Sequence, residues 1–273
     1  MDSKNRKLTT RGYLDLIGVR SLPPRIIPFD PGYDPATLEG HLAQSGHLMA
    51  SLKLSMACWL IADEGVTRRK VAALRAHNVP AVTGGGPFEV AAAQGQLEAY
   101  LDLCADLGVA QVECGEGFTS LAISPAAVVK VAQSRGLRLQ FELGKKHRGA
   151  LTEKNVAKDI DLGREWLDAG AVELVVEARE SALNVGPFDS SGLLNHAIVD
   201  RFADVFGLER LVFEAPNKAS QFAFLEHFGP DVRLGNVRLE EVLRVEIFRR
   251  GLHSDAFGIP KLRPMALNDR RWE

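Results

Sequence analysis

Four glutamates follow short apolar runs at similar places along the chain. Each run is typical of the end of a buried strand, and the acidic residues are Glu113, Glu142, Glu177 and Glu214. Because the carboxyl ends of parallel strands meet at one mouth of a barrel, we expect these carboxylates to cluster. Their mutual repulsion, increased by burial, requires positive charge among them.

Two sources of positive charge are open to such a cluster. Basic residues lie at or just after the same strand ends, namely Lys53, Lys145, Lys146, Arg179 and Lys218. A divalent cation is the other source, since Mg²⁺ takes a few carboxylates together with substrate oxygens and water. One strand-end glutamate is most simply a solvated residue paired with a lysine, but four in the same relative position indicate a functional mouth.

Glycines follow two of the predicted strands. Gly84-Gly85-Gly86 can bring backbone N–H groups close to a ligand anion, or it can simply form a tight turn into a helix. Gly115-Glu116-Gly117 has the same two interpretations. The chain contains no H-x-x-x-H pair, G-x-S-x-G motif or Walker loop, so its motifs do not support a zinc hydrolase, a serine hydrolase or a P-loop NTPase.

These residues need a scaffold of parallel strands, and the apolar periodicity predicts one. The predicted strands are Leu14–Val19, Ser51–Met56, Pro80–Thr83, Gln111–Cys114, Leu137–Leu143, Val172–Ala178, Arg210–Ala215 and Val232–Val237. Eight strands alternating with helical segments over residues 1–273 predict a single-domain α/β protein, a (β/α)₈ TIM barrel. A doubly wound open sheet is the alternative, but no glycine-rich turn follows the first predicted strand. Residues 23–35 then form an ordered loop, and residues 260–273 a polar C-terminal tail.

The composition is that of a folded protein without a nucleic-acid or membrane partner. The chain is 46% hydrophobic and 25% charged, with a net charge of −2. No apolar run is long enough to span a bilayer, and the polar N-terminus is not typical of a secretory signal. Three cysteines without C-x-x-C spacing favour a reducing compartment. We therefore expect a cytoplasmic protein that acts on small molecules.

Five motifs, in this order and spacing, resemble those of the phosphosulfolactate synthase family. They are Gly84-Gly85 with Phe88-Glu89, Glu142-Leu143-Gly144-Lys145-Lys146, Glu177-Ala178-Arg179-Glu180-Ser181, Phe213-Glu214-Ala215-Pro216-Asn217-Lys218, and Arg249-Arg250-Gly251-Leu252 with Asp255 and Phe257-Gly258. The resemblance extends from about Leu14 to Gly258, which is nearly the whole chain.

The resemblance implies a homo-oligomeric barrel enzyme that adds sulfite to phosphoenolpyruvate. The product would be (2R)-phospho-3-sulfolactate, a sulfonate on a route to coenzyme M, and Mg²⁺ would be the cofactor. From their strand-end positions, Glu142, Glu177 or Glu214 would hold the metal. Lys145 or Lys146 would deliver a proton, with a pKa lowered by burial or by cationic neighbours, and Arg179 is a further catalytic candidate. Arg179 and Lys218 are the candidates for the phosphate and the sulfonate, and Lys53 for a second anion contact. The other residues expected to bind substrate are Gly84, Gly85, Glu113, Ser181 and Arg20.

Three segments at the predicted mouth depart from the family pattern. Val19-Arg20-Ser21 stands where the family has Asp-Lys-Gly, Leu54–Cys58 replaces a glycine- and tryptophan-containing run, and Gly115-Glu116-Gly117 replaces Ser-Asp-Gly. Replacing lysine by Arg20 changes a point charge into a planar fork. Two alternatives follow: a diverged enzyme with another nucleophile or acceptor, and a non-enzymatic, stress-associated interaction protein. A phosphosugar aldolase or isomerase is a weaker rival.

Overall fold

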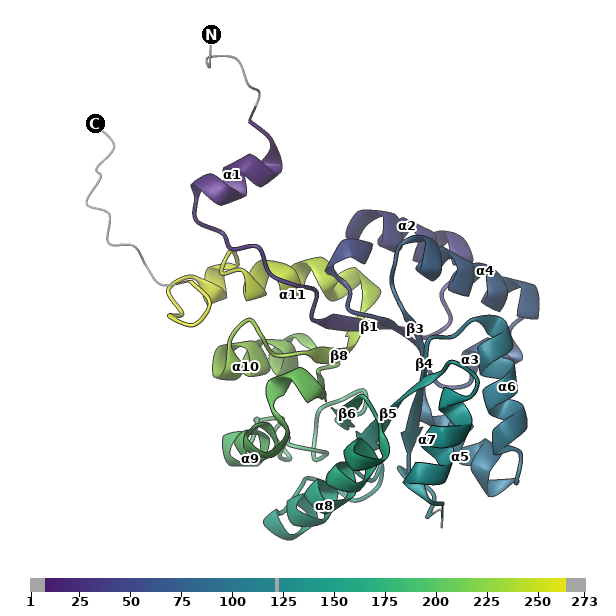
Figure 1. Ribbon diagram of the computed structural model, residues 1–273. Coiled ribbons are helices and arrows are strands. Elements are labelled where there is room, and N and C mark those ends of the chain that lie inside the picture. The colour runs from purple at the N-terminus through teal and green to yellow at the C-terminus, as the bar shows by residue number, and fades with distance from the viewer. Residues whose placement is uncertain (1–7, 121–122, 264–273) are drawn as a thin grey trace, which may run out of the picture.

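Eight parallel strands close into a barrel in which each strand pairs with its neighbours in the sequence, and β8 pairs with β1 (Figure 1). The computed structural model describes residues 8–120 and 123–263. The strands are β1 (Ile26–Asp30), β2 (Leu52–Leu54), β3 (Ala81–Thr83), β4 (Gln111–Gly115), β5 (Arg138–Leu143), β6 (Glu173–Val176), β7 (Leu211–Glu214) and β8 (Leu234–Arg238). The predicted (β/α)₈ TIM barrel is therefore confirmed, and the open sheet is excluded.

Helices surround this barrel, and several of them begin at a residue whose side chain caps the N-terminus. The helices are α1 (Thr10–Leu16), α2 (Pro35–Ser45), α3 (Cys58–Ile61), α4 (Glu64–Ala76), α5 (Gly85–Ala93), α6 (Leu97–Leu107), α7 (Pro125–Gln133), α8 (Glu153–Ala169), α9 (His196–Phe206), α10 (Lys218–Phe228) and α11 (Val242–Arg249). Four short 3₁₀ helices are Gly46–Leu48, Leu208–Arg210, Leu239–Glu241 and Ser254–Ala256. Ser124 and Thr152 cap the N-termini of α7 and α8, as predicted, by accepting backbone hydrogen bonds.

The first predicted strand is wrong. Residues 14–19 do not form a strand: α1 ends at Leu16, and no residue of that helix is buried. The first strand is instead Ile26–Asp30, which lies inside the segment predicted to be a loop. This strand contains Pro28, and the pairing of β1 with β8 shifts by one residue between Ile27 and Pro28. Proline is tolerated at such a bulge because one ladder hydrogen bond is already missing.

The corrected first strand changes one comparison with the family pattern. β1 ends at Asp30 and is followed by Pro31-Gly32, so an aspartate and a glycine do stand at the end of the first strand, and only the lysine between them is replaced. Asp30 is buried, accepts hydrogen bonds from the backbone N–H groups of Gly32 and Tyr33, and pairs with Lys70 at 2.7 Å. These contacts make Asp30 part of the turn that follows β1.

The apolar core lies mainly between the strands and the surrounding helices. Phe141 on β5 stacks on Trp166 of α8 with ring centroids 4.5 Å apart, and Phe213 on β7 stacks on Phe224 of α10 at 4.8 Å. Within the described ranges, no helix is both long and apolar enough to cross a membrane. Residues 264–273 of the predicted polar tail lie outside the described part of the chain.

Candidate active site

A cavity of about 980 Å³ opens at the carboxyl ends of the strands. Most of the residues that the sequence singled out line it: Lys53, Gly84, Gly85, Glu113, Glu142, Lys146, Glu177, Arg179, Ser181 and Glu214. The four strand-end glutamates therefore meet as predicted, and all four are almost completely buried. The carboxyl-terminal mouth of such a barrel is where its active sites lie.

Lys53, on β2, joins two of the four glutamates across the barrel. Its Nζ lies 3.1 and 3.2 Å from the two carboxylate oxygens of Glu113 and 3.2 Å from Oε1 of Glu214. Glu113 also accepts hydrogen bonds from the Gly85 backbone N–H and from Gln140 Nε2. Both oxygens of Glu113 are therefore occupied by donors of this chain.

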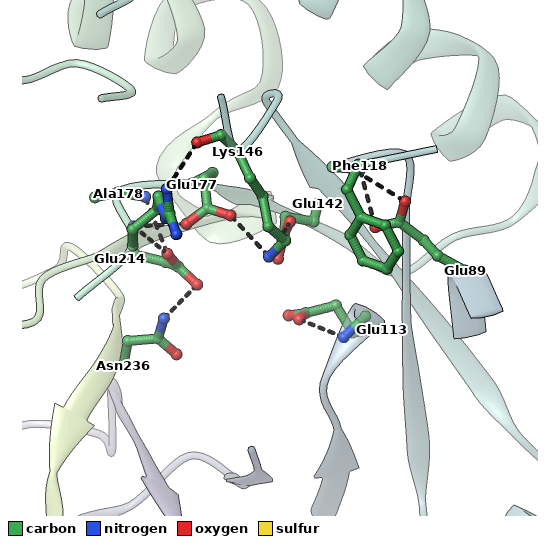
Figure 2. Close-up of polar contacts among 12 residues, drawn as sticks. Glu89, Glu113, Phe118, Glu142, Lys146, Glu177, Ala178, Glu214 and Asn236 are labelled. Atoms are coloured by element: carbon green, nitrogen blue, oxygen red, sulfur yellow. Dashed lines mark hydrogen bonds and ion pairs between the residues drawn. The ribbon is translucent and has the colours of Figure 1, made fainter. Parts of the chain in front are cut away.

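Lys146 lies between the other two glutamates (Figure 2). Its Nζ is 3.3 Å from Oε1 of Glu142 and 3.1 Å from Oε2 of Glu177. Burial by itself lowers the pKa of Lys146, but the charges of Glu142 and Glu177 outweigh it and raise the pKa above its usual range. This is opposite to the lowered pKa that the sequence analysis expected, because the neighbours are anionic. Lys146 is therefore protonated at neutral pH.

The glutamates themselves titrate as a coupled group. Burial, reinforced by the charge of Glu177, raises the pKa of Glu214 to about 8 and the pKa of Glu142 well above its usual range. For Glu177 burial acts in the same direction, but hydrogen bonding with Glu214 and the charge of Lys146 lower its pKa to about 2. The group therefore holds protons at neutral pH, shared around Glu177.

The cluster of four glutamates and two lysines can take up a cation in exchange for protons. With all six groups ionised, four negative and two positive charges give −2. The raised pKa values of Glu142 and Glu214 mean that protons offset this charge at neutral pH, and a bound cation would displace them. Among the residues described, no three His, Cys, Asp or Glu side chains are arranged to hold a metal by themselves. Mg²⁺ commonly needs only one or two carboxylates, with substrate oxygens completing its coordination. One or two of Glu142, Glu177 and Glu214 could supply such carboxylate ligands, with substrate oxygens supplying the others.

Lys145 does not lie in the cavity lining. Its Nζ donates to the backbone carbonyl of Thr119 at 2.8 Å and lies 3.4 Å from Glu116, in the loop after β4. The buried carboxylate of Glu89 holds the same loop, since it accepts from the backbone N–H groups of Gly117, Phe118 and Thr119 and from the Thr119 hydroxyl. Glu89 belongs to the first family motif, but its role in fixing this loop was not predicted from the sequence.

The glycines after β3 bind an anion of the chain itself. Gly85 opens α5, and its N–H donates to Oε1 of Glu113 at 3.0 Å. A Cβ on Gly84 would lie 3.1 Å from the backbone nitrogen of Met56, so this position requires a close backbone approach. The interpretation as a tight turn is therefore confirmed, whereas the Gly85 N–H donates to a carboxylate of the chain itself rather than to a ligand anion.

Two further predicted anion ligands lie on the loop after β6. Arg179 has a left-handed backbone (φ 54°), its backbone N–H donates to Glu177 and Glu214, and its guanidinium donates to the Lys146 carbonyl. Ser181 lines the cavity beside it, and its carbonyl accepts from Asn217. Arg179 thus couples the mouth loop to the glutamate pair below it.

The structure separates Lys218 and Arg20 from the other predicted residues. Lys218 begins α10, is half exposed, and lies 3.3 Å from Asp255 and 5.0 Å from the Phe222 ring. Arg20 is exposed and precedes β1, so it lies toward the amino-terminal end of the barrel, away from the mouth. Neither residue lines the cavity. Arg20 was misplaced because the first strand was misassigned.

Asn236 is a site residue that sequence reasoning missed. It is the unpaired residue at the β1–β8 register shift, its φ is 53°, and it lines the cavity. Its Nδ2 donates to Oε1 of Glu214 at 2.5 Å, whereas its buried Oδ1 has no hydrogen-bond partner within the described residues (Figure 2). Bulges next to active sites redirect side chains in this way. The only sequence signal was an asparagine, which tolerates left-handed φ, near a strand end.

The fold and this site together define a class of protein. A closed (β/α)₈ barrel whose carboxyl-terminal mouth holds a buried, convergent cluster of acids and bases is a TIM-barrel enzyme.

Comparisons with known proteins identify the family. The sequence model described as (2R)-phospho-3-sulfolactate synthase matches residues 27–255. The phosphosulfolactate synthase of Methanocaldococcus jannaschii is 30% identical over 233 residues, covering 85% of this chain and 93% of the relative. The phosphosulfolactate synthase of Methanothermobacter thermautotrophicus is 30% identical, covering 84% of this chain and 89% of the relative. The phosphosulfolactate synthase of Bacillus subtilis is 27% identical, covering 85% of this chain and 91% of the relative. The chain belongs to the phosphosulfolactate synthase family.

Solved structures support the fold at greater distance. The crystal structure of KGPDC from Streptococcus mutans superposes with a TM-score of 0.52 at 12% identity, covering 88% of this chain and 95% of that one. At this identity the likeness concerns the barrel alone.

Proposed function

We propose that this chain adds sulfite to phosphoenolpyruvate to form (2R)-phospho-3-sulfolactate, with Mg²⁺ as cofactor, as a cytoplasmic homo-oligomer. The observation that carries the proposal is the buried cluster of Glu142, Glu177 and Glu214 around Lys146 in the barrel mouth. The names of its curated relatives support the same activity.

The reaction requires one new bond and one proton. The sulfur lone pair of sulfite forms a C–S bond with the methylene carbon, and the C=C electron pair moves onto carbon 2 and its carboxylate. A proton on carbon 2 then completes the product. Lys146 is the donor in this proposal, because it is protonated, faces the cavity and keeps about a quarter of its side chain exposed.

The other residues of the cluster organise the charges. Mg²⁺, when held by Glu142, Glu177 or Glu214 together with substrate oxygens, would stabilise the negative charge that develops on the carboxylate. Lys53 is occupied by Glu113 and Glu214, so it orients the cluster rather than binding a substrate anion alone.

A phosphate group fits best on the side of the cavity formed by the loop after β6. Arg179 is exposed there, and only one of its guanidinium nitrogens makes a hydrogen bond within the described part of the chain. The remaining N–H groups suit the oxygens of a phosphate, and Ser181 beside it adds a hydroxyl.

The proposal is tested by ³¹P NMR of the protein with phosphoenolpyruvate, sulfite and Mg²⁺, each omitted in turn. We expect a new phosphate-ester resonance that requires all three and is lost in Lys146→Met. Lys145→Met is the matched control, and it should retain turnover because Lys145 lies outside the cavity.

Two negative results separate the alternatives. Binding of phosphoenolpyruvate without product would favour an enzyme with another nucleophile or acceptor. If the protein neither binds phosphoenolpyruvate nor forms product, that result would contradict the proposal and favour a non-enzymatic role. The first alternative has one specific observation in its favour, an extensive apolar part of the cavity lining.

A further inference from the structure

One side of the cavity is apolar and exposed. Met56, Leu60, Val90 and Phe118, here called the apolar wall, all line it, and each side chain is between 41% and 56% exposed. They come from the segment after β2, from α3, from α5 and from the loop after β4. Exposed large apolar side chains that gather in one concave site are typical of a ligand-binding surface.

The backbone fixes the positions of two members of the wall. Phe118 belongs to the loop fixed by the buried Glu89, whose carboxylate accepts the Phe118 backbone N–H at 3.1 Å (Figure 2). Its ring lies against Gly86, where a Cβ would be 3.9 Å from Cε1. Met56 has a left-handed backbone with φ 51°, which is unfavourable for a side chain of this kind. A fixed loop and a strained residue both keep apolar groups at the mouth.

The polar and apolar parts belong to one cavity. The buried glutamates with Lys53 and Lys146, here called the charged floor, line the same cavity as the apolar wall. A Cβ on Gly117, the residue before Phe118, would lie 2.8 Å from Cε of Lys146. A ligand that fills the site therefore presents anionic groups to the floor and an apolar group to the wall.

The volume of the cavity exceeds the needs of a three-carbon acid. About 980 Å³ is near the upper end of the roughly 300–1,000 Å³ of pockets that hold drug-sized ligands. Phosphoenolpyruvate and sulfite are small and fully polar, so neither would cover the wall.

We propose that, in addition to phosphoenolpyruvate, this site accepts an enol phosphate acid that carries an apolar substituent on carbon 3. This inference rests on the proposed function, because it keeps the anionic head on the charged floor and the same addition chemistry. In this proposal the substituent lies on the wall, because a single molecule with an anionic head and an apolar group contacts both parts of the one cavity.

The test compares two ligands and three proteins. Titration calorimetry with Mg²⁺ measures the Kd of phosphoenolpyruvate and of the enol phosphate of phenylpyruvate. We use the wild-type protein, Phe118→Ala, and Leu243→Ala as a control with an exposed apolar residue on α11, outside the cavity. The Phe118 substitution leaves the bonds of Glu89 to the loop backbone intact.

We expect the phenyl ligand to bind the wild-type protein at least about tenfold more tightly, since each buried methylene contributes about fourfold in affinity. Phe118→Ala should remove most of this gain and leave the affinity for phosphoenolpyruvate unchanged, while Leu243→Ala changes neither. Equal or weaker binding of the phenyl ligand to the wild-type protein would overturn the inference. An equal loss for both ligands in Phe118→Ala would do the same.

The same measurements distinguish failure of this inference from failure of the proposed function. If phosphoenolpyruvate binds and the phenyl ligand does not, the inference fails alone; if neither binds, the proposed function fails with it. Sedimentation equilibrium of the wild-type and Phe118→Ala proteins addresses a second copy of the chain. Loss of assembly in the variant would assign the wall to an interface and overturn the inference.

Discussion

Replacing Lys53 by methionine should reveal the charge balance of the barrel mouth. Methionine keeps much of the length of the side chain and removes its charge. Lys53 is buried and contacts two carboxylates at 3.1–3.2 Å. Removing one partner of a buried ion pair costs about 3–5 kcal/mol of unfolding free energy. Because Glu113 and Glu214 both retain other hydrogen-bond donors, we expect a loss near the lower end of that range, about 3 kcal/mol, at alkaline pH.

The loss should depend on pH. Burial and then the charge of Glu177 raise the pKa of Glu214 to about 8, whereas an unfolded glutamate has a pKa of about 4.3. The folded state then holds a proton that the unfolded state has released, so this group lowers stability progressively as pH rises from about 4.3 to about 8. The charge of Lys53 lowers the pKa of Glu214, so removing Lys53 raises this pKa further and Glu214 keeps its proton to higher pH. At about pH 6 Glu214 is neutral in both proteins, so only Glu113 loses a charged partner and the cost should be about half.

Urea denaturation at about pH 6 and about pH 9 measures both values. Lys70→Met is the matched control, because Lys70 is equally buried but pairs with the single carboxylate of Asp30 at 2.7 Å. Its loss should be the same at the two pH values. A loss for Lys53→Met that is independent of pH, or below about 1 kcal/mol, would refute the coupled-cluster reasoning.

Three further substitutions test the elements around the cluster. Glu89→Gln should lower the unfolding free energy by about 2–3 kcal/mol in urea, because its amide would face an N–H donor of the loop; a loss below about 0.5 kcal/mol would contradict this. Asn236→Leu should lower kcat/KM at least about tenfold by releasing Glu214, and an unchanged pH–rate profile would count against that role. Gly117→Ala should reduce turnover at least about tenfold with a melting temperature within a few degrees of wild type, since the new Cβ would lie 2.8 Å from Lys146 Cε. Full activity would show that Lys146 can move without consequence.

Much of the barrel could be predicted because its signals are local. Seven predicted strands overlap observed ones, since buried parallel strands are short apolar runs bounded by turns. The first strand failed because Pro28 is compatible with a strand only at the bulge opposite β8, and a bulge depends on two segments about 200 residues apart. Because of this error, Arg20 was wrongly predicted to lie at the mouth, and Asp30-Pro31-Gly32 was not matched to the family's Asp-Lys-Gly.

The candidate site could also be predicted only in part. Four glutamates at equivalent strand ends had to converge once the strands were parallel, and this followed from the sequence. Which of the adjacent lysines faces the cavity did not follow, because Lys145 and Lys146 lie at the irregular end of β5. In the tertiary structure Lys146 pairs with the carboxylates of Glu142 and Glu177, whereas Lys145 contacts the loop after β4.

The sequence by itself determined the barrel, the family and the acidic mouth, because each depends on residue types and spacing along the chain. Only the tertiary structure decided the raised pKa of Lys146, the redirected side chain of Asn236 and the apolar wall around Phe118. Each of these depends on what lies across the barrel rather than along it. Packing energies fall steeply with distance and electrostatic energies fall more slowly, and the closure of the barrel sets the distances for both.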